Sequence, residues 1–199
     1  VSDTPVEATA RWPSARRTPE GRKTGPSDPG AAIHTPFGAT ESLPVASISS
    51  LEVLRETAQQ TRQGKGVCVG KPVPTAQVKI IKISDDPIST WDQAEELPQG
   101  EIGEICVRGP NVMQGYWRLP EATAETFAGD WLRTGDLGYL DADGYIFMVD
   151  RKKDMVIVNG MNVYPRMVEE VLYQHPGVLE AAVVGEPHPS HGEIVVAHV

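Results

Sequence analysis

The stretch WLRTGDLGYLDADGYIFMVDRKKD, residues 131–154, decides the expected fold. Residues 131–139 and 145–149 have the composition of strands, and Asp141-Ala-Asp-Gly144 between them is typical of a turn. These residues therefore predict a strand pair, with a charged run at residues 150–154 that follows the second strand.

The same reading extends to the rest of the chain and predicts an α+β fold. Strands are expected where apolar residues cluster, and a hairpin is expected around Asn159-Gly160. Helices are expected after Ser49 or Ser50 and at two prolines, because proline is favoured at the first helical position. The expected strands are 31–35, 78–83, 102–108, 131–139, 145–149, 155–158, 162–164, 178–184 and 194–199, and the expected helices are 51–58, 121–127 and one from Pro165.

Both ends of the chain differ from this pattern. Residues 1–32 contain five prolines and scattered basic residues, and show no hydrophobic period. Such a segment cannot bury enough apolar surface to offset its ordering entropy, so we expect a disordered or non-family leader. The strand at 194–199 is expected to end as an unpaired edge. We therefore expect the chain to be a fragment.

Composition excludes several classes of protein. The formal net charge is −9, a field that repels phosphate backbones, so a nucleic-acid partner is not expected. No apolar run approaches the roughly 20 residues of a transmembrane helix, and the N-terminus lacks a signal-peptide pattern. The two cysteines, Cys68 and Cys106, fit neither a disulfide framework nor a zinc site. A cytoplasmic location is therefore expected.

Two short motifs contain side chains that could bind phosphate, Mg²⁺ or a ribose. Thr40-Glu41 places a hydroxyl and a carboxylate after a short strand, which suits phosphate and Mg²⁺, and Phe37 before it could stack on a base. Asp136 follows Gly135 at a strand end, where an ionised carboxylate can accept hydrogen bonds from a ribose diol. The alternatives are an ordinary turn or helix cap for Thr40-Glu41, a core position for Phe37 and a turn carboxylate for Asp136.

Two further features point to a hinge and to close ligand approach. The run Asp150-Arg-Lys-Lys-Asp154 is either a solvated turn or a hinge that presents Arg151 to an anion. Gly160 either lets a thin ligand approach the backbone or simply completes a hairpin turn.

Six motifs occur in order along the chain: Phe37-Gly-Ala-Thr-Glu41, Gly103-Glu-Ile-Cys-Val-Arg-Gly109, Val112-Met-Gln-Gly-Tyr-Trp117, Trp131-Leu-Arg-Thr-Gly-Asp136, Asp150-Arg-Lys-Lys-Asp154 and Gly160-Met-Asn-Val-Tyr-Pro165. Taken together, these motifs resemble the adenylate-forming enzymes, a superfamily of acyl-CoA synthetases, luciferases and peptide-synthetase adenylation domains. The resemblance covers Ile33 to Val199. From Gly103 onward the sequence is most similar to bacterial long-chain fatty-acid–CoA ligases, whereas residues 31–98 resemble the β-lactone synthetases of olefin biosynthesis.

The resemblance implies a domain organisation and a reaction. Residues 33–150 would be the C-terminal part of the large adenylation domain, with its distorted β-barrel region, and residues 151–199 the first half of a small mobile C-terminal domain. A fatty or other hydrophobic carboxylic acid would attack ATP and give an acyl-adenylate. A thiol, commonly that of coenzyme A, would then displace AMP. A β-lactone synthetase would instead close a lactone. ATP, Mg²⁺ and coenzyme A are the implied cofactors.

The resemblance also implies a role for each motif residue. Phe37 would pack near adenine with Gly38 beside it, Thr40 would contact phosphate, Glu41 would bind Mg²⁺, Asp136 and Arg151 would hold the ribose hydroxyls, Lys153 would be the hinge, and Gly160 would line the pantetheine path.

Two family features are absent from the sequence: the Ser/Thr/Gly-rich phosphate loop with its lysine, and the catalytic lysine near the family's C-terminus. We therefore expect the chain to be inactive alone, with the missing segments lying upstream and downstream. Two alternatives from other classes are a non-catalytic nucleotide-binding module and a protein-interaction fragment that pairs through the apolar strand at 194–196.

Overall fold

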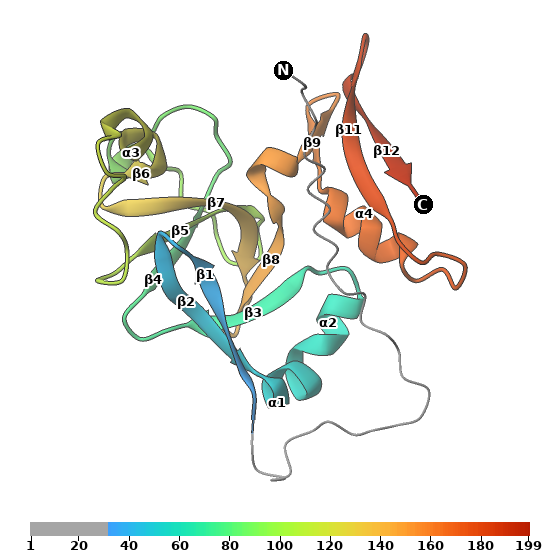
Figure 1. Ribbon diagram of the computed structural model, residues 1–199, viewed down its shortest axis with the longest axis horizontal. Helices are drawn as coiled ribbons and strands as arrows, with labels where there is room; N and C mark the ends of the chain where they lie inside the picture. Colours follow the sequence, from blue (N-terminus) through green and yellow to red (C-terminus); the bar gives the residue numbers. More distant parts are fainter. Residues whose placement is uncertain (1–31) are drawn as a thin grey trace, which may run out of the picture. The chain divides into compact units, whose positions relative to one another are not determined.

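Two antiparallel sheets organise residues 32–199, the part of the chain that the computed structural model describes (Figure 1). The expected leader, residues 1–32, lies outside the described residues except for Ala32. Short helices accompany both sheets, so the predicted α+β class is confirmed. Within residues 32–199 no helix is long and apolar enough to cross a membrane.

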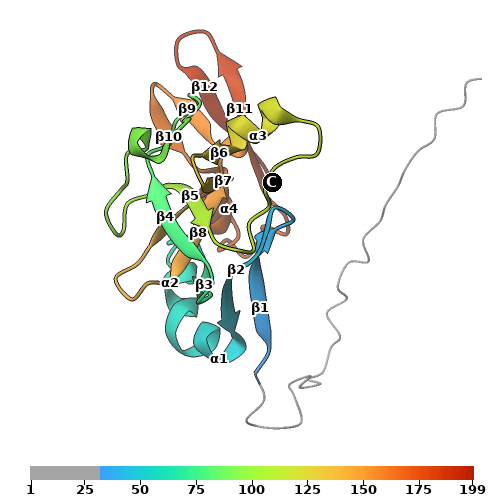
Figure 2. The same ribbon diagram turned by 90° about the vertical axis from the view of Figure 1, so that its left-hand side faces the viewer.

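The first sheet has the strand order β1-β2-β3-β8-β7-β5-β4, and β6 pairs with β7. Figure 2 shows β1 and β2 side by side, with β3 next to them. The strands are β1 (His34–Ala39), β2 (Ser42–Ser49), β3 (Val67–Pro72), β4 (Gln77–Ile81), β5 (Gly103–Arg108), β6 (Phe127–Ala128), β7 (Trp131–Leu140) and β8 (Ile146–Arg151).

The second sheet has the order β10-β9-β12-β11. Asn159 and Gly160 connect β9 to β10 with φ angles of 51° and 78°, the left-handed conformation that a two-residue hairpin turn requires. This confirms the hairpin predicted from Asn159-Gly160. The strands are β9 (Val156–Val158), β10 (Met161–Val163), β11 (Ala182–His188) and β12 (Gly192–His198).

The expectation of an unpaired final strand is wrong. β12 pairs with β11 along its length, from Gly192 opposite His188 to His198 opposite Ala182. It also meets β9 at Gly192, opposite Val158. The residues between β11 and β12 form a tight turn, and a hairpin of this kind satisfies the backbone groups of its two strands locally.

Helices cover only short segments of the described chain. Ser49 caps the first helix through a capping box, in which its side chain accepts from Glu52 N–H while the Glu52 carboxylate accepts from Ser49 N–H. That helix begins where predicted and contains a π-helical segment, Val53–Thr57. The α-helices are α1 (Ser50–Glu52), α2 (Ala58–Arg62), α3 (Pro120–Thr126) and α4 (Pro165–Leu172), and 3₁₀ turns occur at Trp91–Gln93 and Lys152–Asp154.

Three strands were not predicted from the sequence: β2, β3 and the two-residue β6. β2 contains Pro44 and β3 contains Gly70 and Pro72, residues that normally mark turns. A substituent on Gly70 would lie 2.0 Å from the Ser47 carbonyl oxygen, so β2 and β3 approach closely at this glycine. Similarly, β1 continues through Pro36 rather than ending before it.

The first sheet holds the main core. β5 is buried from Gly103 to Val107, because it lies between β4 and β7 with both of its faces covered. A second cluster forms around Phe147 of β8, whose ring stacks on Tyr139 with centroids 5.3 Å apart. The larger cluster consists of Val45, Ala46, Ala76, Ile80, Ile105, Val107 and Ile146.

Phe147→Ala should lower the free energy of unfolding by about 3–5 kcal/mol, because the fully buried ring leaves a cavity against Tyr139. Leu54→Ala removes a side chain that is 75% exposed and should change stability by less than about 0.5 kcal/mol. Urea unfolding of the two variants measures both values. Equal losses would contradict the assignment of Phe147 to the core.

Candidate nucleotide site

A cavity of about 590 Å³ opens where the β1–β2 hairpin, β7 and the end of β8 come together. Residues far apart in the chain line it, among them Tyr116, which the sequence reading assigned no role. Six of the eight residues singled out from the sequence line this cavity: Phe37, Gly38, Glu41, Asp136, Arg151 and Lys153.

Glu41 lies in the turn between β1 and β2 and is held at two atoms. The Tyr116 hydroxyl donates to Glu41 Oε1 at 3.0 Å, and Met113 N–H donates to the Glu41 carbonyl oxygen at 2.8 Å. Burial and the adjacent Glu41 carboxylate raise the pKa of Tyr116, so its phenol stays protonated and donates.

Thr40 shares that turn, yet its side chain is exposed and does not line the cavity. Gly38 stands where the β1–β2 register shifts, with φ of 155°. A substituent on Gly38 would lie 2.4 Å from the Ser42 carbonyl oxygen, so the bulge requires glycine at this position.

Asp136 reaches the cavity because β7 bulges beside β5. Glu104 of β5 pairs with Leu137 of β7, and Cys106 pairs with Arg133. A single β5 residue therefore lies opposite residues 134–136 of β7, and these three residues form the bulge. Gly135 adopts φ of 72° in it. The Thr134 hydroxyl donates to the carbonyl oxygen of Ile105, opposite the bulge, and accepts from Asp136 N–H at 3.1 Å.

Asp136 and Arg151 face each other across β7 and β8. They are register partners, with Arg151 Nε 3.5 Å from Asp136 Oδ1. The Asp136 side chain is 14% exposed and that of Arg151 is 61% exposed. Burial raises the pKa of Asp136 above its ordinary value, and Arg151 partly opposes this shift. The pair therefore offers a carboxylate acceptor and a guanidinium donor side by side.

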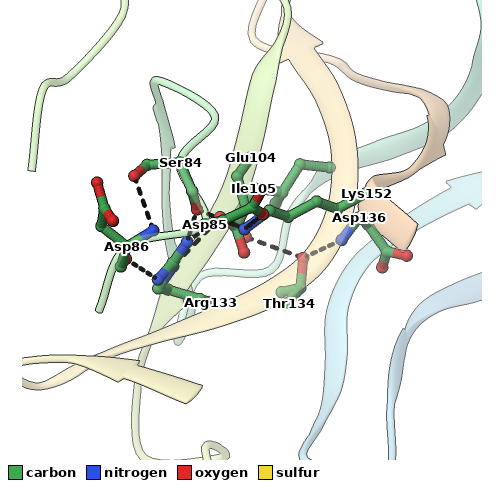
Figure 3. A network of polar contacts seen from close by, with 9 residues as sticks. All are labelled: Ser84, Asp85, Asp86, Glu104, Ile105, Arg133, Thr134, Asp136 and Lys152. Atoms are coloured by element: carbon green, nitrogen blue, oxygen red, sulfur yellow. Dashed lines mark hydrogen bonds and ion pairs between the residues drawn. The ribbon is translucent and has the colours of Figure 1, made fainter. Parts of the chain in front are cut away.

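A buried ion pair between Arg133 and Glu104 lies at the wall of the cavity, which Arg133 lines (Figure 3). Arg133 Nη2 is 2.7 Å from Glu104 Oε2, and the two side chains are 6% and 3% exposed. Arg133 also donates to the carbonyl oxygens of Ser84 and Asp86. A buried charge needs such partners, so the pair fixes the loop at residues 84–86 against β5 and β7.

Lys152 joins the same network from the connection between the sheets. Its ammonium group donates to the Ser84 carbonyl oxygen and lies 3.0 Å from Asp85 Oδ1 and 3.9 Å from Glu104 Oε2. The sequence reading missed Lys152 and Glu104. Glu104 could have been identified from the sequence, because a lone carboxylate inside the apolar run at 102–108 requires a buried partner.

The remaining predicted residues lie at different places. Lys153 is exposed at the rim of this cavity, in the 3₁₀ turn that follows β8. Gly160 is exposed in the β9–β10 turn, outside this cavity and outside the polar cleft between α4 and the second sheet. No group of three or more His, Cys, Asp or Glu side chains in residues 32–199 is placed to hold a metal ion by itself.

Comparison with known proteins identifies the family. Residues 19–117 match the AMP-binding enzyme family, and residues 167–199 match the C-terminal domain of AMP-binding enzymes. The first match begins inside the segment 1–32. The chain belongs to this family, whose members are enzymes.

Individual relatives agree with the match. The long-chain-fatty-acid–CoA ligase of Escherichia coli O6:H1 is 41% identical over 159 residues, which is 80% of this chain and 25% of that protein. The amide bond synthetase McbA from Marinactinospora thermotolerans is 40% identical, with a TM-score of 0.68 over 82% of this chain and 30% of that one.

A third relative is the o-succinylbenzoate CoA synthetase MenE from Bacillus subtilis, solved with an acyl-adenylate intermediate. It is 34% identical, with a TM-score of 0.67 over 84% of this chain and 31% of that one. The chain thus spans about a quarter of the length of the curated relatives it matches.

Arg133→Met should lower the free energy of unfolding by about 3–5 kcal/mol, because it leaves the Glu104 carboxylate buried without its main partner. Lys82→Met is the matched control. It removes a cation whose pair with Glu95 is more than 60% exposed on both sides, and should cost less than about 1 kcal/mol. Chemical unfolding distinguishes the two, and an Arg133 variant as stable as the Lys82 variant would contradict the buried network.

Proposed function

We propose that this chain carries part of the nucleotide site of an enzyme that activates a carboxylic acid with ATP. The acid attacks the α-phosphorus, which gives an acyl-adenylate and pyrophosphate, and a thiol then displaces AMP. The observation that carries the proposal is the convergence of Glu41, Asp136 and Arg151, from three separate segments, on one cavity. Positioning and electrostatic stabilisation dominate chemistry of this kind.

The nucleoside end of the cavity lies at Asp136 and Arg151. An ionised, largely buried carboxylate accepts the two hydroxyl hydrogens of a ribose, and the guanidinium beside it donates to ribose or phosphate oxygens. Phe37 and Gly38 line the same cavity, where an aromatic ring and an uncrowded backbone suit the adenine.

The phosphate end lies at the β1–β2 turn, with Thr40 as a phosphate contact and Glu41 as the Mg²⁺ ligand. Mg²⁺ in nucleotide enzymes is commonly held by one or two carboxylates and the substrate's phosphates. Glu41 fits this use, since only its Oε1 is hydrogen-bonded within residues 32–199 and its Oε2 has no partner there. When bound, Mg²⁺ offsets the negative charge of the phosphates.

The boundary between the two domains is proposed at residues 150–151. The first sheet ends at Arg151 and the second begins at Val156. Residues 33–150 would therefore be the C-terminal part of the large domain, and residues 151–199 would be the first part of the small domain. Lys153 between the sheets would be the hinge, and Gly160 would meet the pantetheine of coenzyme A after the small domain rotates.

A fatty or other hydrophobic acid is the proposed substrate, with coenzyme A as the acceptor. The Escherichia coli relative, a long-chain-fatty-acid–CoA ligase, supports both. The amide bond synthetase among the structural relatives shows that the acceptor varies between relatives. The β-lactone synthetase alternative shares the adenylation step and differs after it.

Asp136→Asn should weaken AMP binding at least tenfold, because a neutral amide replaces the charged acceptor of the ribose hydroxyls. Its fold should be more stable than that of the parent at pH 7. Burial raises the pKa of Asp136, so the ionised form costs stability, and the amide removes that cost. The stability difference between the two proteins should shrink as the pH falls through this raised pKa.

Titration calorimetry with AMP measures the change in affinity, and urea unfolding measures the change in stability. Asp92→Asn, an exposed acid outside the cavity, is the control and should change neither. Wild-type chain that does not bind AMP, or an Asp136 variant that binds AMP as the parent does, would contradict the proposed function.

A further inference from the structure

One short segment, residues 111–116, holds Glu41 at both its backbone and its side chain. Met113 N–H donates to the Glu41 carbonyl oxygen at 2.8 Å, and the Tyr116 hydroxyl donates to Glu41 Oε1 at 3.0 Å. The two residues that share the phenol–carboxylate bond are 75 positions apart in the chain. The turn that carries Glu41 is therefore braced by a distant segment.

The segment itself is fixed at both ends. At its start, the Asn111 amide donates to the Pro44 carbonyl oxygen at 2.7 Å, and Val112 forms a β-bridge with Ser42. At its end, Tyr116 N–H donates to the Thr123 hydroxyl of α3 at 2.9 Å. The phenol thus extends from a backbone that main-chain and side-chain contacts already position.

The phenol bond adds little to the attachment of this segment, since the contacts of Asn111, Val112 and Met113 already join it to the β1–β2 hairpin. The hydrogen bond from the Tyr116 phenol instead restricts the conformation of the Glu41 side chain. An unrestrained glutamate samples several rotamers, and a hydrogen bond to one carboxylate oxygen restricts that freedom. Tyr116 also lines the cavity, so its hydroxyl acts at the site.

We propose that Tyr116 is a positioning residue that orients the Glu41 carboxylate for a phosphate-bound divalent cation. The hydroxyl engages Oε1 and leaves Oε2, which has no partner within residues 32–199, as the cation ligand. This inference rests on the proposed function, because it assumes that Mg²⁺ enters the cavity with ATP. Tyr116 acts through Glu41 and not through contact with the nucleotide.

The test compares ATP binding with Mg²⁺ and with EDTA, by titration calorimetry on the 199-residue chain and its Tyr116→Phe variant. The variant keeps the ring and removes only the hydroxyl. The increase in ATP affinity that Mg²⁺ produces should fall about fivefold to tenfold, the effect of one typical hydrogen bond. ATP affinity in EDTA and the urea midpoint should not change.

Two further variants make the comparison specific. Tyr139→Phe removes another phenol, which donates to the Lys65 carbonyl oxygen outside the cavity, and should leave the Mg²⁺ effect unchanged. Glu41→Gln should abolish most of the Mg²⁺ effect. In the Glu41→Gln background Tyr116→Phe should cost nothing further, because the two residues act as a unit.

The outcomes separate this inference from the function on which it rests. Wild-type chain that binds ATP and gains affinity with Mg²⁺, together with an unaffected Tyr116→Phe variant, would overturn the role of Tyr116 alone. A variant that loses affinity equally with Mg²⁺ and with EDTA would also overturn it, since the phenol would then act on the whole cavity. Wild-type chain that binds no ATP would overturn both proposals.

Discussion

The buried ion pair between Arg133 and Glu104 is the constraint on which the cavity depends. Both side chains are more than 90% buried, and a charge left unpaired at that depth costs several kcal/mol. Its guanidinium also satisfies the carbonyl oxygens of Ser84 and Asp86. β5, β7 and the loop at 84–86 can therefore pack in only those arrangements that keep this network complete.

The bulge on β7 places Asp136 at the cavity, next to the buried ion pair. Arg133 precedes the bulge and is buried at the cavity wall. Gly135 then changes the backbone direction, and Asp136 reaches the cavity with 14% of its side chain exposed. Pairing with β8 then sets Arg151 opposite Asp136, and the next residue, Lys152, turns to the buried network. Neighbouring cations thus have different partners: Arg151 pairs with Asp136, whereas Lys152 pairs with Asp85 and Glu104.

Local sequence determined much of the fold. Asn159-Gly160 and the prolines at 120 and 165 specify a hairpin and two helix starts through backbone sterics alone, so these elements could be predicted without tertiary information. β2 and β3 could not, because Pro44, Gly70 and Pro72 give turn signals that sheet pairing overrides. The pairing of β12 with β11 likewise depends on contacts between strands.

For the site, the sequence by itself determined which residues had suitable chemistry: a carboxylate after a strand in Glu41, another after glycine in Asp136, and a guanidinium in Arg151. Only the tertiary structure decided which of them share a cavity, and that Tyr116 reaches Glu41 while Thr40 and Gly160 stay outside the lining. The physical reason is that chemistry belongs to a side chain, whereas proximity between distant segments comes from strand register, a bulge and a buried ion pair.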